Sequence, residues 1–92
     1  MHFVFYGKDK KGGLQLRLDN REAHIKWLKS QPIPLAGPLL DEAGTMCGSM
    51  VVCEAEDLAS AQALFSADPY AKAGLFDSSE ITPWKWVVGK DN

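Results

Sequence analysis

The sequence predicts a single α+β domain over residues 1–92 that works as a dimeric α+β barrel. Its 92 residues are enough for one domain. Strand and helix patterns follow one another in the order βαββαβ, and right-handed connections then give one antiparallel sheet with both helices on the same face. The first and third strands are apolar on both faces, so the face without helices needs a second copy to cover it.

The chain begins with a strand and a helix. Residues 2–7 are rich in aromatic side chains and precede a loop of lysines and glycines, which predicts a strand. A helix is predicted from about residue 16 to residue 30, because Leu18, Ile25 and Leu28 recur at helical spacing. The proline that follows ends this helix.

The middle of the chain predicts a hairpin. Residues 33–40 are apolar but contain two prolines and a glycine, so they form an edge or irregular strand, since proline cannot donate a ladder hydrogen bond. Residues 41–44 form the turn. Residues 46–54 are the clearest strand, with apolar or small residues at every position before its terminal glutamate.

The second helix begins after Asp57, a favourable N-cap, and runs from residue 58 to about residue 67. Its buried stripe is expected to contain four apolar side chains: Leu58, Ala61, Leu64 and Phe65. Asp68 followed by Pro69 predicts a further helical turn through Ala73, closed by Gly74.

Residues 75–88 predict a long last strand. Pro83 interrupts it, which implies a bulge or an unpaired edge at that point. Trp84 and Trp86 share one face and are assigned to the core or to the dimer interface. Residues 89–92 are expected to form a tail.

Composition excludes several classes of protein. A net charge of −2 argues against a nucleic-acid-binding protein. No apolar run approaches the roughly 20 residues that span a bilayer, and the N-terminus lacks the pattern of a signal peptide, so a cytoplasmic location without membrane contact is expected. Cys47 and Cys53 lie about 20 Å apart along one strand, too far for a disulfide, and are interpreted as reduced thiols without a metal.

Arg17, Arg21, His24 and Leu28 follow one line along the first helix, because three or four residues separate each from the next. One interpretation is an anion-binding site with a general base, since histidine titrates near neutral pH and arginine holds oxyanions. The other is an exposed polar helix face. The spacing by itself leaves both interpretations open.

Three further positions have a structural and a functional interpretation. Asp68 serves as an N-cap, and its carboxylate could also orient His24. Ser49, next to Gly48, either permits close packing or presents a hydroxyl to a substrate. Gly37 and Pro38 mark a strand irregularity, which often forms the rim of a pocket.

These motifs together resemble those of the YciI-related (YCII) family. The resemblance extends from Phe3 to Gly89 and rests on four motifs, which are R21-x-x-H24, the segment L35-A-G-P-L39 ahead of the G48-S49 strand, D68-P-Y-x-x-x-G-L75 and I81-x-P-W84. It implies a ferredoxin-like sandwich, a homodimer and an active site built on His24 and Asp68. Around this pair we expect substrate-binding residues at Arg17, Arg21, Gly37, Pro38, Ser49 and Tyr70.

The resemblance implies chemistry without a cofactor or metal. One branch of the family eliminates chloride from a chlorinated hydroxyhydroquinone, and muconolactone isomerase shares the fold. Both reactions are acid–base reactions on small oxygenated rings. We therefore expect a lyase or isomerase acting on a small anionic or phenolic metabolite, with a non-catalytic ligand-binding or interaction module as the alternative. We also expect His24 and Asp68 to meet, at roughly 2.6–3.2 Å if the contact is direct.

Overall fold

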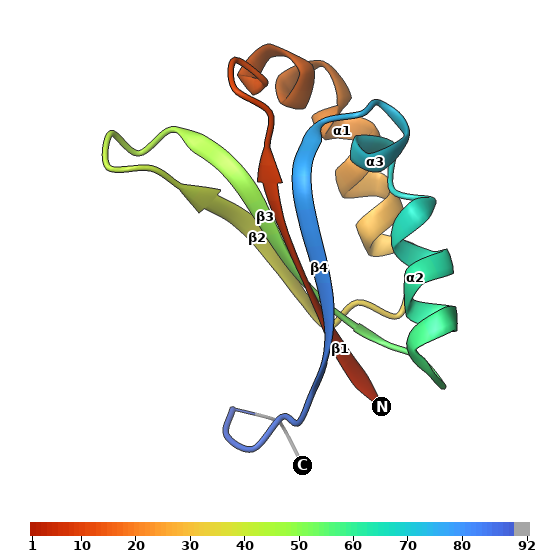
Figure 1. Cartoon of the computed structure of the whole chain (residues 1–92). Helices are drawn as coiled ribbons and strands as arrows, with labels where there is room; N and C mark the ends of the chain where they lie inside the picture. Colours follow the sequence, from red (N-terminus) through yellow and green to blue (C-terminus); the bar gives the residue numbers. More distant parts are fainter. Residues whose placement is uncertain (90–92) are drawn as a thin grey trace.

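A four-stranded antiparallel sheet carries the helices on one of its faces (Figure 1). The structure, a computed structural model, describes residues 1–89. Their order in the chain confirms the predicted βαββαβ arrangement with an extra helical turn before the last strand. The elements are β1 (His2–Asp9), α1 (Leu14–Lys29), β2 (Leu35–Leu40), β3 (Met46–Glu54), α2 (Leu58–Ser66), α3 (Pro69–Lys72) and β4 (Phe76–Trp84).

The core lies between the two central strands and the helices. The strand order is β2-β3-β1-β4, which places β1 and β3 in the middle. In β1 and β3, Phe3 pairs with Cys53 and Phe5 pairs with Val51. Side chains alternate between the faces of a strand, so these four point to the same face. They are buried with two residues of α2 and form the core cluster Phe3, Phe5, Val51, Cys53, Ala61 and Phe65.

The opposite face of the sheet, called the open face here, is also largely apolar. Val4 pairs with Val52, and Tyr6 pairs with Met50. These residues alternate with the core residues along their strands and therefore point away from the helices. Tyr6 is 46% exposed and Met50 is 37% exposed. The structure thus confirms that the central strands are apolar on both faces.

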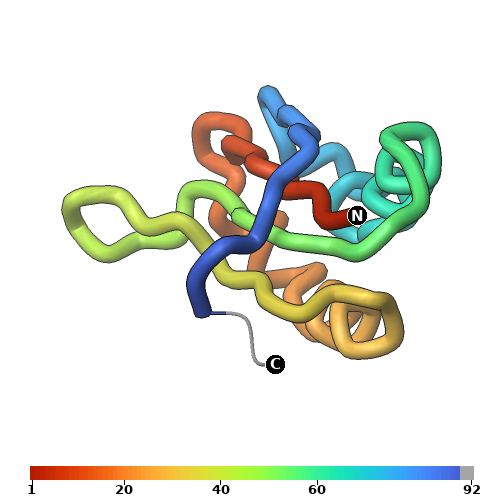
Figure 2. Tube along the Cα trace, turned by 90° about the horizontal axis from the view of Figure 1, so that it is seen from below, coloured from red at the N-terminus to blue at the C-terminus, as the bar shows by residue number. Residues whose placement is uncertain are grey.

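The hairpin of β2 and β3 extends away from the helices, as both views show (Figures 1 and 2). β2 is an edge strand, as the prolines of residues 33–40 predicted, although it begins only at Leu35, after the first of them. In the turn, the Asp41 carboxylate accepts hydrogen bonds from the backbone N–H groups of Ala43 and Thr45. Gly44 has a φ of 82°, a conformation that glycine adopts without strain.

The inward side of α1 differs from the apolar stripe that its leucine spacing predicted. Leu18, expected in the apolar stripe, is 47% exposed, whereas Ile25 and Leu28 are partly buried. The two buried residues of α1 are Arg17 and His24. Seven residues separate them, so they lie on one side of the helix. The polar line of α1 therefore faces inward, and the apolar spacing was a poor guide to its orientation.

α2 begins as predicted and buries less of its first turn than predicted. Asp57 caps it by accepting a hydrogen bond of 2.8 Å from the backbone N–H of Ser60. Ala61 and Phe65 are buried, but Leu58 is 42% exposed. Leu58 lies among the exposed residues 56–60, ahead of the part of the helix that packs on the sheet.

α3 confirms the helical turn that Asp68 and Pro69 predicted. Asp68 accepts a hydrogen bond of 2.9 Å from the backbone N–H of Tyr70, and Pro69 occupies the first turn. Gly74 ends the turn with a φ of 74°. Because α3 contacts α1, the turn brings Asp68 and Tyr70 to the polar line of α1.

β4 is shorter than predicted, since it ends at Trp84, and Val87 and Val88 are 76% and 86% exposed beyond it. Beyond Trp84 the chain leaves the edge of the sheet (Figure 1), so these valines have no neighbouring strand. Pro83 pairs with Phe3 without a shift in register. Of the two predicted explanations for Pro83, the edge strand is therefore the correct one, because an outward-facing edge needs no donor.

The two C-terminal tryptophans are not part of the core. Trp84 is 37% exposed, and its ring packs against the rings of His2 and Trp86. Of the predicted tail, Gly89 is described, and residues 90–92 lie outside the described residues.

The described residues contain no helix that is long and apolar enough to cross a bilayer. Both cysteines are free thiols, but neither is half-buried as their place in one strand had suggested, since Cys47 is exposed and Cys53 is buried. Burial raises the pKa of the Cys53 thiol, because the thiolate loses its hydration.

Candidate functional site

The inward polar line of α1 forms the floor of the candidate site. Arg17 is 2% exposed and His24 is 6% exposed, whereas Arg21, between them, is exposed. Buried arginine and histidine side chains need polar partners, because an unpaired buried polar group is costly. The interpretation of this line as an exposed polar face is therefore wrong for Arg17 and His24.

His24 and Asp68 meet directly. Nδ1 of His24 lies 2.7 Å from Oδ1 of Asp68, although 44 positions separate the two residues in the sequence. This distance confirms the predicted contact. The side chain of Asp68 is 3% exposed and that of His24 is 8% exposed, so water scarcely competes for the hydrogen bond.

The same carboxylate oxygen of Asp68 accepts hydrogen bonds from the His24 ring and from the backbone N–H of Tyr70. An ionised carboxylate only accepts, so Nδ1 of His24 carries the hydrogen. In the neutral ring, Nε2 then keeps its lone pair and is the basic nitrogen. Both interpretations of Asp68 are thus correct, since it caps α3 and orients the imidazole.

Tyr70 holds the imidazole from one side. Its ring stacks on His24 with centroids 3.7 Å apart and planes 13° apart. Trp27 adds a second stacked contact to His24, with centroids 6.2 Å apart. Tyr70 is 1% exposed. Burial raises the pKa of its phenol, and the positive charges of Arg17 and Arg21 oppose this shift.

Arg17 contacts residues of β1 and β3 and the ring of Tyr70. Its Nε donates to one carboxylate oxygen of Asp9 at 2.7 Å, and its Nη2 donates to the other at 2.9 Å. Nη2 also donates to Oγ of Ser49 at 2.8 Å. The guanidinium carbon lies 4.6 Å from the centroid of the Tyr70 ring. Burial by itself would lower the pKa of Arg17, but its hydrogen bonds to Asp9 and the charge of Asp9 raise it.

Asp9 is the member of this network that the sequence did not reveal. It lies at the end of β1, where the register against β4 shifts between Lys8 and Asp9. Eight residues separate it from Arg17, and a loop between the two breaks any helical or strand periodicity. A carboxylate at the end of a central strand, followed by a glycine-rich loop into a helix, is the signal that could have suggested it.

A cavity of about 260 Å³ opens beside His24. The predicted substrate-binding residues, which come from α1, β2, β3 and α3, line it. The expectation that Ser49, Gly37 and Pro38 share one cavity with His24 is therefore confirmed. Asp68 lies behind His24 and does not line the cavity. The lining residues are Arg17, Arg21, His24, Ile25, Leu28, Ala36, Gly37, Pro38, Ser49 and Tyr70.

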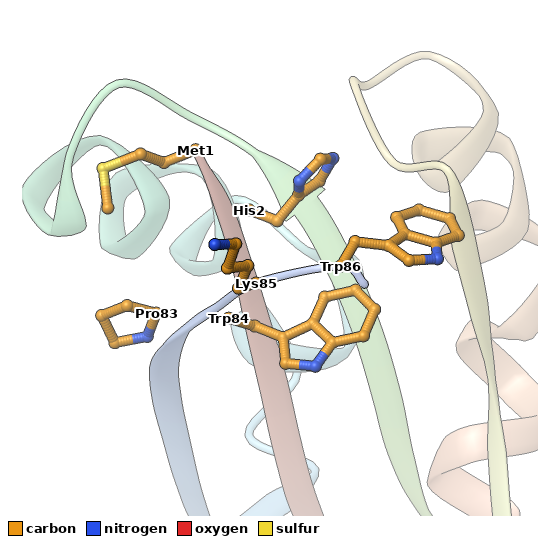
Figure 3. Close-up of a pocket in the computed structure, with 6 residues that line it drawn as sticks. All are labelled: Met1, His2, Pro83, Trp84, Lys85 and Trp86. Carbon is orange, nitrogen blue, oxygen red and sulfur yellow. The ribbon is translucent and has the colours of Figure 1, made fainter. Parts of the chain in front are cut away.

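A larger hollow of about 550 Å³ lies at the other end of β1 (Figure 3). The rings of His2, Trp84 and Trp86 gather there and pack edge-on or tilted against one another, with centroids 5.4 to 6.4 Å apart. Among residues 1–89, neither Asp nor Glu lines this hollow, so this part of the chain places no His/Asp pair there. Despite its smaller volume, the cavity beside His24 is therefore the better candidate for chemistry.

Metal ligands do not gather in either place. Within residues 1–89, no group of three or more histidine, cysteine, aspartate or glutamate side chains could hold a metal ion. The buried polar side chains of the site are instead paired with one another, Arg17 with Asp9 and His24 with Asp68.

Comparison with known proteins places the chain in context. Residues 1–85 match the model of the YCII-related domain. Protein YciI of Escherichia coli and protein YciI of Shigella flexneri are each 34% identical to the chain, with 95% of the chain and 99% of the relative covered. An uncharacterized protein of Haemophilus influenzae is 33% identical over the same shares.

Solved structures agree with these relatives. The 5-chloro-2-hydroxyhydroquinone dehydrochlorinase of Burkholderia phenoliruptrix, in complex with 2,5-dihydroxybenzoquinone, superposes with a TM-score of 0.86. It is 35% identical and covers 99% of this chain and 100% of its own. A NIPSNAP domain protein of Burkholderia xenovorans has a TM-score of 0.56 at 13% identity, with 99% and 98% covered, and supports the fold only.

Proposed function

The chain belongs to the family of YCII-related domain proteins, and on this basis we propose that it is a cofactor-independent acid–base enzyme of the lyase or isomerase type. Its substrate is a small anionic or phenolic metabolite, bound in the cavity beside His24. The observation that carries the proposal is the buried hydrogen bond of 2.7 Å between His24 and Asp68. A binding protein has no need of a buried, oriented imidazole at the wall of its cavity.

His24 is the proposed general base. Its Nδ1–H donates to Asp68, which leaves the lone pair of Nε2 to take a proton from the substrate. The imidazolium that forms is stabilised by the Asp68 carboxylate. In an elimination, the C–H bond breaks to His24, its electron pair forms the new double bond, and the leaving group departs with the electrons of its own bond. In an isomerisation, the protonated ring returns the proton to another atom.

Oxygen atoms of the substrate are held by the polar side chains that line the cavity beside His24. Arg21 supplies a cation there, Ser49 and Tyr70 supply hydroxyl groups, and Arg17, which is paired with Asp9, holds Ser49 in place. Such donors stabilise the negative charge that develops when a proton leaves. The dehydrochlorinase, similar over its whole length, holds a dihydroxybenzoquinone. That ligand supports a small oxygenated ring as the class of substrate for this chain.

A dimer is the proposed working form. The open face exposes Tyr6, Met50 and Trp84, and a chain this short gains stability when such a face is covered. We propose that the open face of a second copy covers it, sheet against sheet.

The alternative is a non-catalytic ligand-binding or interaction module on the same fold. The aromatic hollow near Trp84 favours it, because that hollow offers exposed apolar rings and, within the described part of the chain, no His/Asp pair. In this case ligands would bind without being transformed.

A ligand screen separates the two functions. Small aromatic and carboxylic acids are tested for a thermal shift with the natural chain and with His24→Ala. Each ligand that binds is then incubated with both proteins and followed by ultraviolet absorbance. The enzyme hypothesis expects turnover by the natural chain and loss of turnover, with binding retained, in His24→Ala. Binding without turnover by the natural chain supports the module instead.

A further inference from the structure

We infer that the two arginines of the site have different tasks: Arg17 positions the site together with Asp9, whereas Arg21 alone selects a singly charged oxyanion. This inference rests on the proposed function, because it assigns a ligand class to the same cavity. It also assigns a role to Asp9, whose side chain is hydrogen-bonded to Arg17.

The charge of Arg17 is already balanced. Its side chain is 2% exposed and that of Asp9 is 5% exposed, so the ion pair is shielded from water. Two guanidinium nitrogens donate to the two oxygens of one carboxylate, at 2.7 and 2.9 Å. A bidentate pair of this kind is short and directional, and it brings no net charge to the cavity. A second anion at Arg17 would have to compete with Asp9.

The ion pair of Arg17 and Asp9 also affects the hydrogen bonding of Ser49. A hydroxyl group has one hydrogen to donate and two lone pairs to accept with. Nη2 of Arg17 uses the hydroxyl oxygen as an acceptor at 2.8 Å. Ser49 lines the cavity, so its own hydrogen remains available to a ligand oxygen there. Arg17 therefore occupies one acceptor site of Ser49 and leaves its hydrogen free to donate to a ligand.

Arg21 is the cation that remains available. It lies one helical turn beyond Arg17, lines the same cavity and is exposed. Among residues 1–89, it forms no ion pair, since the ionic contacts of this part of the chain are Arg17 with Asp9 and His24 with Asp68. Its charge can pair with one oxyanion of the ligand.

A doubly charged ligand fits poorly. Asp68 contributes a fixed negative charge behind His24, and the Arg17 charge is balanced by Asp9. After Arg21 has paired with one oxyanion, a second one would face Asp68 without compensation. The apolar wall of Ile25, Leu28 and Pro38 instead suits the face of a ring, and about 260 Å³ has room for one ring. The ligand class is a single ring with one ionised oxygen group and one neutral oxygen.

Three probes with the same meta geometry test the charge preference. They are 3-hydroxybenzamide, 3-hydroxybenzoate and isophthalate, which carry no, one and two negative charges at neutral pH. Dissociation constants are measured by titration calorimetry. The natural chain is expected to bind 3-hydroxybenzoate about tenfold more tightly than either of the others, a difference of roughly 1.4 kcal/mol.

Substitutions assign the preference to one arginine. Arg21→Gln is expected to remove the tenfold preference for 3-hydroxybenzoate over neutral 3-hydroxybenzamide, whereas isophthalate should still bind poorly because Asp68 is unchanged. Lys26→Gln is the control, because Lys26 is an exposed cation of α1 that does not line the cavity. The double variant Asp9→Asn with Arg17→Gln removes a neutral pair and is expected to keep the preference. If Arg21→Gln still binds 3-hydroxybenzoate about tenfold more tightly than 3-hydroxybenzamide, the inference is wrong, whether or not the double variant folds.

The outcome is distinguishable from failure of the proposed function. If Arg21 controls the charge preference but no bound probe or screened ligand is ever transformed, the inference stands and the enzyme hypothesis fails. If turnover depends on His24 while the preference is independent of Arg21, the enzyme hypothesis stands and the inference fails.

Discussion

The imidazole of His24 and the carboxylate of Asp68 meet at 2.7 Å, and the oxygen that binds the ring also caps the helix that carries Tyr70. Tyr70 in turn stacks on the same imidazole, with centroids 3.7 Å apart. One aspartate therefore orients the histidine directly and also fixes the short helix whose tyrosine packs on it. Changes at Asp68 are expected to affect stability and chemistry together.

Asp68→Asn separates these two roles. Asparagine is as good an N-cap as aspartate, so the free energy of unfolding should fall by less than about 1 kcal/mol. The imidazolium loses its anionic partner, and turnover should fall by up to the roughly 10²–10⁴-fold that a general base contributes. The measurements are urea unfolding and kcat/KM. Asp57→Asn is the control, because Asp57 caps α2 and does not line the cavity. Unchanged turnover in Asp68→Asn would contradict the role of the pair.

Arg17→Met should destabilise the fold strongly. It leaves the buried Asp9 carboxylate without its partner, and breaking a buried ion pair from one side costs about 3–5 kcal/mol. Chemical denaturation measures the change. The double variant with Asp9→Asn should recover part of it, because no buried charge then remains. A loss of less than about 1 kcal/mol in Arg17→Met would show that water reaches this pair in solution.

Gly48→Ala should destabilise the sheet, whereas Gly37→Ala should not. A methyl group at Gly48 would lie 2.5 Å from the carbonyl oxygen of Gly7, and one at Gly37 would meet nothing within 4 Å. Forcing a group into a packed site costs typically about 1–3 kcal/mol. Melting temperatures of the two variants test the contrast. Since Gly37 lines the cavity, Gly37→Ala also probes ligand affinity on an intact fold.

The two thiols should differ in reactivity. Burial raises the pKa of Cys53, so at any given pH less of it is the reactive thiolate, and the labelling reagent cannot reach it. Cys47 is exposed. Iodoacetamide followed by mass spectrometry should show one modification on the folded protein and two after denaturation. Rapid modification of Cys53 without denaturant would mean that the core opens on the labelling timescale.

The chain should be a dimer that a charge on the open face disrupts. Met50→Glu introduces a carboxylate at the middle of that face, where the proposed partner would bury it. Size-exclusion chromatography with light scattering should give a dimer for the natural chain and a monomer for this variant. Leu58→Glu, on an exposed position of α2, is the control and should remain a dimer. A monomeric natural chain at micromolar concentration would contradict the proposal.

Much of the fold could be predicted because the signals are local. Asp57 and Asp68 cap helices through hydrogen bonds to residues two or three positions away. The prolines of β2 and β4 restrict these strands to the edges, and residues 41–44 form a turn through the side chain of Asp41. Such features depend on neighbours in the chain, so composition and spacing reveal them.

The orientation of α1 was decided by the tertiary structure. Its sequence has leucines at helical spacing and an arginine–histidine line, and both are plausible inward faces. The helix turned Arg17 and His24 inward and left Leu18 exposed, because Asp9, Ser49, Asp68 and Tyr70 supply polar partners from other elements. None of these partners shares a periodic pattern with α1.

The sequence by itself determined the order of the elements, their caps and turns, the edge strands and the residue types of the site. Only the tertiary structure decided that Arg17 is neutralised by Asp9 while Arg21 remains free of ion pairs within residues 1–89. The tertiary structure also decided that β4 ends at Trp84. The physical reason is that caps and turns are hydrogen bonds between near neighbours, whereas ion pairing and strand length depend on which distant segments the folded chain brings into contact.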